Sequence, residues 1–401
     1  MTAGYPTILC GVRPPDVLRT LVDRFDPEVF DARDGDARLR LSLTGESSWD
    51  AVFAAGGLRL EPASGQPDAE LRAGATTWSA LARDMAIGLE AYGRGDLVLR
   101  HNLHLAVAFL AATSGSIDPA RMRFRTVRPS GRRFSLLEAG AGEPLVMLHG
   151  LGGTKASFLP TVAALSNRYR TIAVDLPGFG DSGKPLGASY DPAFFSRTVL
   201  SLLDELGLER VHLLGHSMGG RAALELALDH PDRIAGLILV APSLAWLRER
   251  PWARYLRYLR PELGLLQAAP RPVVEAIIHR LVPDAKTPSV QASLDEFMRA
   301  YLTPRGRAAF YAAARQIYLE EPDAFWARLA TLAPESLFVW GRQDEVVPIG
   351  FARHVRKHVP RARHVELACG HVPQVERPAH LHSAIGDFLG RLPYPALASA
   401  A

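Results

Sequence analysis

The residues best suited to chemistry are a serine, an aspartate and a histidine, in that order along the chain. Ser217 stands in the segment GHSMGG at 215–220, directly after the apolar run 211–214 and before a helix-forming stretch. This pattern predicts a strand, a sharp turn with the serine at its tip, and a helix whose N-terminal amides face the serine. Glycines suit such a turn, because without Cβ atoms the strand and the helix can pass closely.

Asp344 and His371 follow two later strand-like runs, at 336–340 and 363–367. A serine hydroxyl becomes a good nucleophile when a histidine takes its proton and an acid holds that histidine in one tautomer. Glu345 is the neighbouring candidate for the acid. We prefer Asp344, because it comes first after the turn that ends the strand.

A glycine-rich turn lies upstream of the serine. The strand-like run 144–148 leads into HGLGG at 149–153. We expect the backbone N–H groups of Leu151 and Met218 to bind the oxyanion that forms when a serine attacks a carbonyl. The alternative is that the glycines only close a turn.

Together these motifs resemble the α/β-hydrolase family over about residues 124–392. The resemblance implies an α/β fold, a mostly parallel sheet with a helical lid, here preceded by a small α+β domain. It also implies Ser217 as nucleophile, His371 as base, Asp344 as acid, and no cofactor. Serine at this turn argues against the epoxide-hydrolase and haloalkane-dehalogenase branches, which use aspartate there.

The insertion at about 243–333 is expected to form the lid. It is rich in aromatic residues, which favours a small-molecule substrate that is an apolar, lipid-like ester, cleaved through an acyl-enzyme. Three readings stay open: C–C bond hydrolysis of ring-fission diketones, lipid carriage on a hydrolase scaffold, and aromatics that mainly form the lid's own core. Arg250, Arg254 and Arg257 are spaced to share one face of a helix. That face could contact lipid or a membrane peripherally, or it could simply be exposed to solvent. The aromatic residues of the insertion are Trp246, Trp252, Tyr255, Tyr258, Phe297, Tyr301, Phe310, Tyr311, Tyr318, Phe325 and Trp326.

The first 120 residues lie outside this pattern. Strands are expected at 37–43, 58–61, 69–72 and 97–100, helices at 78–92 and 103–112, and a linker at 114–119. We therefore predict two domains, 1–120 and 124–401. The element order resembles sterol-carrier-type domains, which hold a lipid in an apolar tunnel. The alternative is an unrelated α+β domain that packs on the hydrolase.

Composition limits the remaining classes of function. The 401 residues carry a formal net charge of +4, and the arginines are scattered, which does not indicate nucleic-acid binding. Two cysteines, no leader-like N-terminus and no long apolar run favour a cytoplasmic protein. The segment 178–184 fits a phosphate-loop pattern, but Pro185 follows it in place of a serine or threonine. His101 and His104 have helical spacing, but the sequence shows no cysteine or acid placed to complete a metal site with them.

Overall fold

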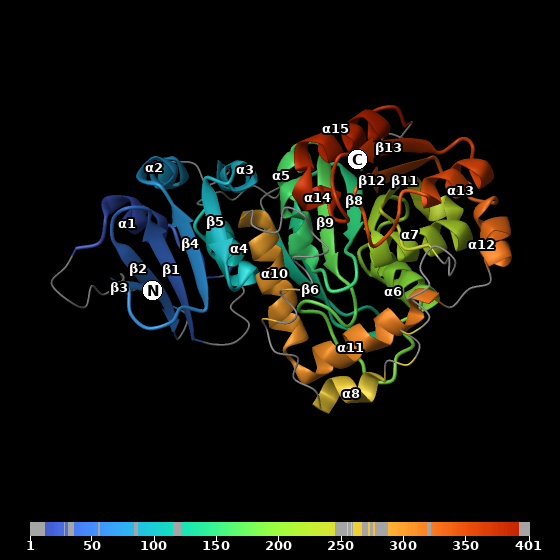
Figure 1. The fold of residues 1–401 in the computed structure, drawn as a ribbon. Helices are drawn as coiled ribbons and strands as arrows, with labels where there is room; N and C mark the ends of the chain where they lie inside the picture. Colours follow the sequence, from blue (N-terminus) through green and yellow to red (C-terminus); the bar gives the residue numbers. More distant parts are fainter. Residues whose placement is uncertain are drawn as a thin grey trace.

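The computed structural model describes most of the chain as two β-sheets with their helices (Figure 1). The described residues are 13–27, 29–30, 36–54, 57–83, 87–114, 122–244, 255, 258, 260–266, 272, 276, 288–318 and 322–392. None of the helices in these ranges combines the length and the hydropathy that are needed to span a bilayer.

The larger sheet has eight strands in the order β13-β12-β11-β10-β8-β9-β7-β6. Its strands from β8 onward run parallel, whereas β7 pairs antiparallel with β6 and β9. The bounds are β6 Arg123–Val127, β7 Phe134–Ala139, β8 Glu143–Leu148, β9 Tyr169–Asp175, β10 Val211–His216, β11 Ile234–Val240, β12 Ser336–Gly341 and β13 Arg363–Leu367. The expected mostly parallel α/β sheet is thereby confirmed.

Helices cover both faces of this sheet, which is why its central strands are apolar on both sides. Along β8, Leu145 and Met147 belong to one core cluster, and Val146 and Leu148 belong to the other. Helices α5 (Leu159–Leu165) and α15 (Pro378–Leu389) pack on the first face. Helices α6 (Pro192–Glu205), α7 (Ser217–Asp229), α12 (Pro322–Leu329) and α13 (Phe351–His358) pack on the second.

The N-terminal unit is a five-stranded sheet in the order β3-β2-β1-β4-β5, with four helices. The elements are α1 Asp16–Val22, β1 Ala37–Leu43, β2 Ser48–Ala54, β3 Gly57–Pro62, β4 Ala69–Ala73, α2 Ala75–Arg83, α3 Ile87–Arg94, β5 Leu97–Arg100 and α4 Leu103–Ala112. The four expected strands and the helix at 103–112 are present. Where a helix was expected at 78–92, the structure describes α2 up to Arg83 and α3 from Ile87, and residues 84–86 lie outside the described residues. Most of the expected linker, 115–119, lies outside the described residues.

The lid insertion contributes α8 (Pro261–Leu266), α10 (Pro288–Tyr301), α11 (Pro304–Ala314) and η5 (Arg315–Tyr318). Helix α10 lies between the N-terminal unit and the larger sheet, while α8 and α11 lie below the sheet in this view (Figure 1). One apolar cluster joins Phe109 of α4, Ala292 of α10 and Phe158 before α5. The two units therefore share a continuous core.

Described aromatic residues of the insertion pack in two clusters. Phe297, Tyr301, Phe310 and Tyr311 form one cluster between α10 and α11. Phe325 and Trp326 instead join the core beneath α12 and α13. Trp246, Trp252 and the arginines at 248, 250, 254 and 257 lie outside the described residues.

Candidate active site

Ser217 occupies a strained turn between β10 and α7, as the sequence predicts. Its φ angle is +51°, in the left-handed region that costs an ordinary residue about 1–2 kcal/mol. A Cβ on Gly215 would lie 2.4 Å from the carbonyl oxygen of Gly219, and a Cβ on Gly219 would lie 2.3 Å from that of Leu148. Only glycine fits at these two positions, so the close passage of strand and helix explains the motif.

The structure brings the three predicted residues into one hydrogen-bonded chain. Nε2 of His371 lies 2.9 Å from Oγ of Ser217, and Nδ1 of His371 lies 2.8 Å from Oδ2 of Asp344. With its proton on Nδ1, the imidazole donates to Asp344 and accepts from the Ser217 hydroxyl. All three side chains are buried or nearly so, which strengthens these interactions by keeping water away.

The acid is fixed from both sides. The other carboxylate oxygen of Asp344, Oδ1, accepts the backbone N–H groups of Val346 and Val347, each at 2.8 Å. Glu345, the alternative acid, is exposed, whereas Asp344 is buried and contacts His371. The geometry therefore favours Asp344 over Glu345.

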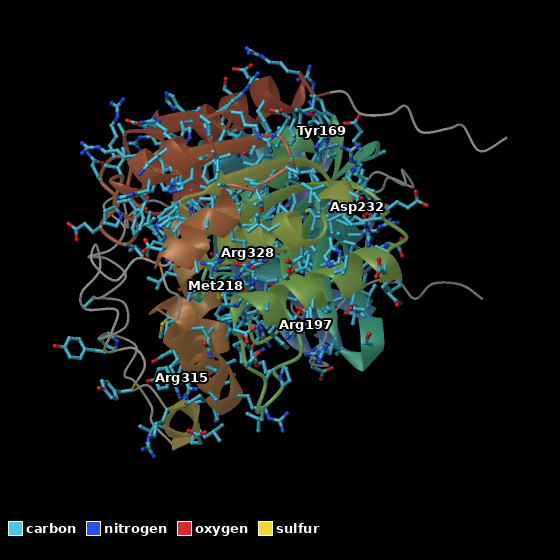
Figure 2. All side chains as sticks on the ribbon, turned by 90° about the vertical axis from the view of Figure 1, so that its right-hand side faces the viewer. Tyr169, Arg197, Met218, Asp232, Arg315 and Arg328 are labelled. Atoms are coloured by element: carbon cyan, nitrogen blue, oxygen red, sulfur yellow. The ribbon has the colours of Figure 1, made fainter. Side chains whose placement is uncertain are left out.

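The loop at 149–153, called the oxyanion loop after the role expected for Leu151, is held in place by His149. This histidine is fully buried, and burial lowers its pKa, so the ring stays neutral. Nδ1 donates to the carbonyl oxygen of Gly150 at 2.8 Å, while Nε2 accepts the N–H of Leu176 at 3.0 Å. A Cβ on Gly150 would lie 3.0 Å from Cβ of Ser217, so the loop passes directly against the serine. Leu151 follows on this loop, and Met218 lies within the body of the molecule at the start of α7 (Figure 2).

His216 supports the loop that carries His371, a role that the sequence does not reveal. Burial lowers the pKa of His216 to about 3, so its ring is neutral at ordinary pH. Its Nε2–H donates to the carbonyl oxygen of His371 at 2.7 Å. The residue that precedes Ser217 therefore holds the backbone of His371.

Glu376 is a second support that sequence reasoning missed. Its buried carboxylate accepts the N–H of Gly370 at 2.9 Å through one oxygen and the N–H of Val372 at 2.9 Å through the other. These amides flank His371 on both sides. Glu376 thus fixes the loop on which the imidazole sits.

We expect Glu376→Gln to lower kcat/KM about 10- to 100-fold, because an amide can accept only one of the two N–H groups and its NH2 would oppose the other. Ester turnover and a thermal melt would measure this effect. Glu366→Gln, at a more exposed glutamate on β13, is the matched control. Unchanged turnover in a folded Glu376→Gln protein would show that the loop does not depend on this carboxylate.

Aromatic and aliphatic side chains contact the oxyanion loop and the loop that carries His371. A Cβ on Gly152 would lie 2.6 Å from the ring of Phe297 and 3.3 Å from the ring of Phe310. Next to His371, Val372 and Val375 pack against Val290 of α10. These side chains therefore give the site an apolar side.

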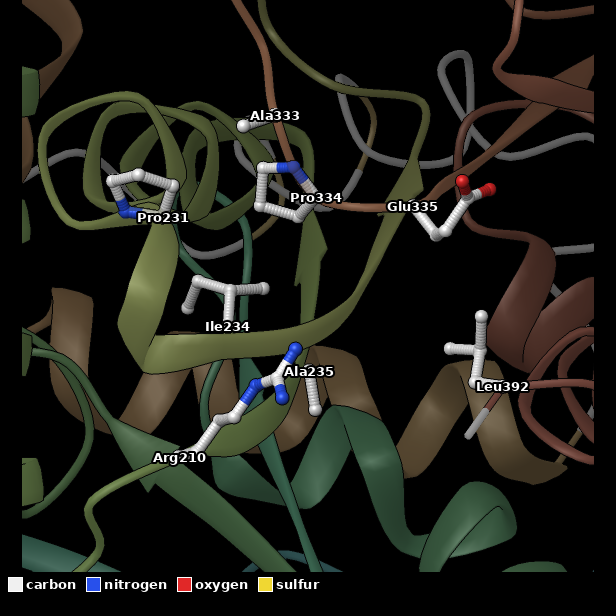
Figure 3. Close-up of a pocket in the computed structure, with 8 residues that line it drawn as sticks. All are labelled: Arg210, Pro231, Ile234, Ala235, Ala333, Pro334, Glu335 and Leu392. Atoms are coloured by element: carbon white, nitrogen blue, oxygen red, sulfur yellow. The ribbon is translucent and has the colours of Figure 1, made fainter. Parts of the chain in front are cut away.

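A separate pocket lies far from these residues. It has a volume of about 260 Å³ and opens near Ile234, the first residue of β11 (Figure 3). Ser217 follows the last residue of β10, so it lies at the opposite end of these parallel strands. Ligands of such sheets bind beyond the carboxyl ends of the strands, so we assign no function to this pocket. Its lining residues are Arg210, Pro231, Ile234, Ala235, Ala333, Pro334, Glu335 and Leu392.

Known proteins with similar sequences and structures agree with this architecture. The family model described as alpha/beta hydrolase fold matches residues 143–378. The 2-hydroxymuconate semialdehyde hydrolase of Pseudomonas sp. (strain CF600) is 30% identical over 280 residues, which cover 66% of this chain and 93% of that protein. The dihydrolipoyllysine-residue acetyltransferase component of the acetoin cleaving system of Pseudomonas putida is 35% identical over 266 residues. These residues cover 65% of this chain and 67% of that protein.

Among solved structures, a membrane phospholipase A described as a bacterial virulence factor is 27% identical, with a TM-score of 0.56. The match covers 67% of this chain and 86% of the phospholipase. The family model spans more than half of the chain, and the strand order and the serine turn agree with it. The chain therefore belongs to the α/β-hydrolase family.

Proposed function

We propose that the protein is a serine hydrolase that cleaves an ester of an apolar, lipid-like substrate through an acyl-enzyme. The observation that carries this proposal is the continuous Ser217–His371–Asp344 contact at the strained turn. Binding alone would not require these three residue types together. Hydrolysis requires all three.

The reaction begins with attack of Ser217 Oγ on the ester carbonyl carbon while Nε2 of His371 takes the hydroxyl proton. Asp344 stabilises the imidazolium, and the amides of Leu151 and Met218 bind the oxyanion. When the C–O bond breaks, His371 gives its proton to the leaving alcohol. Water then attacks the acyl-enzyme and loses its proton to His371, which passes that proton to Ser217 Oγ as the acyl C–O bond breaks and the carboxylic acid departs.

The surroundings of the serine support an apolar acyl group. Phe297 and Phe310 lie over the oxyanion loop, and Val290, Val372 and Val375 lie beside the base. Burying a chain of methylenes among such side chains is favourable by about 0.8 kcal/mol per CH₂. The similarity to a phospholipase A is consistent with this class of substrate.

A second candidate is C–C bond hydrolysis of a ring-fission diketone. Its support is the similarity to 2-hydroxymuconate semialdehyde hydrolase, and the same three residues could serve both reactions. Phe297 and Phe310 beside Gly152, and the valine cluster beside His371, favour the ester for this chain.

A substrate panel separates the two candidates. We expect turnover of p-nitrophenyl esters, with kcat/KM rising about tenfold or more from short to medium acyl chains because each buried methylene adds binding energy. A ring-fission dienoate would be assayed in parallel by loss of its visible absorbance. Faster turnover of the dienoate than of every ester would overturn the ester proposal in favour of C–C cleavage.

For the N-terminal unit we propose a separate domain, residues 1–120 beside 124–401, that binds lipid as sterol-carrier-type domains do. Supporting it, this unit contains an apolar helix, α4, whose every residue is buried. Solvent extraction of the purified full-length protein, followed by mass spectrometry, should recover a lipid in molar proportion. Recovery of none, together with no binding of a fluorescent fatty acid by Ser217→Ala, would contradict a lipid-binding or carrier role.

A further inference from the structure

We propose that Phe297 limits the length of acyl chain accepted at Ser217, and that the N-terminal unit holds Phe297 in place by clamping helix α10. The proposal rests on the serine-hydrolase function above and names a specificity determinant for it. It also gives the N-terminal unit a role in the hydrolase reaction that needs no bound lipid.

Helix α10 presents different side chains to its two neighbours. Asp295 and Phe297 are two positions apart, which places them on roughly opposite faces of the helix. Phe297 is only half-buried and lies against Gly152, the residue after the proposed oxyanion donor Leu151. Its ring is therefore placed to close one end of an acyl-binding space.

The opposite face of α10 is fastened to the N-terminal unit. Oδ2 of the buried Asp295 accepts Nε of Arg100 at 2.7 Å and the backbone N–H of His101 at 3.0 Å. Glu296, also buried, accepts the N–H of Leu103 at 2.6 Å. Leu103 is the first residue of α4, so this carboxylate lies where a helix N-terminus favours negative charge.

A chain of buried ion pairs continues from α10 into the larger sheet. The guanidinium of Arg299 donates to Glu296 at 3.0 Å and to Asp181 at 2.9 Å. Nζ of Lys155 donates to the same Asp181 at 2.8 Å and to Asp175 at 2.7 Å. The backbone N–H of Lys155 also donates to Asp175 at 2.7 Å, just beyond the oxyanion loop. The same network therefore contacts the N-terminal unit, the lid helix and the loop beside the serine.

The burial of Asp295 and Glu296 explains why these contacts hold α10 in one position. A carboxylate removed from water is stable only with its hydrogen-bond and charge partners in place, so Asp295 and Glu296 resist any movement of α10 that separates them from Arg100 and α4. Because Phe297 is rigidly attached to the same helix, its position over Gly152 depends on contacts made by another unit of the chain. Arg100 and Asp295 act as positioning residues, whereas Phe297 meets the substrate.

The test compares rates of inactivation of the full-length protein by p-nitrophenyl alkylphosphonates with butyl and dodecyl chains. These probes react with an activated serine whether the natural substrate is an ester or a diketone. Phe297→Ala is expected to raise the dodecyl-to-butyl rate ratio about tenfold or more, because the larger space admits further methylenes. Arg100→Ala should raise the same ratio, and Arg100→Lys, which keeps a cation for Asp295, should stay closer to the parent protein.

Arg72→Ala is the matched control, because Arg72 pairs only with Glu70 of its own strand among the contacts described here. It should leave the ratio unchanged. If Arg100→Ala fails to fold, Asp295→Asn weakens the same pair and keeps an acceptor for the His101 amide.

Three outcomes would overturn the proposal. An unchanged ratio in folded Phe297→Ala would remove Phe297 as the limit. If the dodecyl-to-butyl rate ratio changes in Phe297→Ala but not in Arg100→Ala or Asp295→Asn, the N-terminal unit does not hold Phe297 in place. No inactivation of the parent protein by either probe would overturn the serine-hydrolase function itself, and this inference with it.

Discussion

Ser217→Ala is expected to lose ester turnover by about 10⁴-fold or more, while the protein keeps its fold. Removing the hydroxyl deletes the atom that attacks the substrate, and His371 then has no nucleophile to activate. Alanine lacks only the hydroxyl, so the change leaves no cavity at the turn. The initial rate of p-nitrophenyl butyrate hydrolysis, with a thermal melt of both proteins, measures this.

Ser196→Ala is a suitable control, since Ser196 is buried on α6 and away from the site. It should keep full turnover. Equal turnover by Ser217→Ala and the parent protein would show that ester hydrolysis does not use this serine.

Asp344→Asn is expected to fold normally and to lose about 10⁴-fold in kcat. The two amides of Val346 and Val347 require an oxygen at the position of Oδ1, so the asparagine NH2 must take the position of Oδ2, facing His371. His371 must then accept at Nδ1 and carry its proton on Nε2. In that tautomer it donates to Ser217 and cannot take the hydroxyl proton.

Glu345→Gln, at the exposed neighbouring acid, is the matched control and should leave kcat unchanged. Both variants would be assayed at saturating ester. Full activity of Asp344→Asn with loss in Glu345→Gln would transfer the role of the acid to Glu345.

The serine turn was predictable because its causes are local. Gly215 and Gly219 are required by contacts within a few residues or with the adjacent strand, and these requirements appear as a short pattern. The larger sheet was predictable for a related reason. Its central strands are buried on both faces, so they occur as continuous apolar runs between turns.

The supports of the site could not be read from the sequence in the same way. His216 and His371 are 155 positions apart, and the contact uses a backbone carbonyl, which has no sequence signature. Glu376 is close to His371 along the chain, but its carboxylate binds main-chain amides that any residue would offer.

In the N-terminal unit, strand β2 was missed because Asp50 interrupts its apolar pattern. That carboxylate is fully buried, and Arg38 and Arg40 of the neighbouring strand β1 pair with it. These partners hold the pKa of Asp50 below its ordinary value despite the opposing effect of burial. A charged residue in a strand interior becomes understandable only once the strand pairing is known.

The measurement that tests the central claim most directly is the site of acylation. The protein would be mixed briefly with p-nitrophenyl butyrate, quenched in acid, digested with trypsin and analysed by mass spectrometry. The peptide 211–221 contains Ser217 as its only hydroxyl side chain. A butyryl group is expected on this peptide in the parent protein and none on it in Ser217→Ala. Turnover of the ester with acylation on a different peptide, or persisting in Ser217→Ala, would contradict the assignment of Ser217 as the nucleophile.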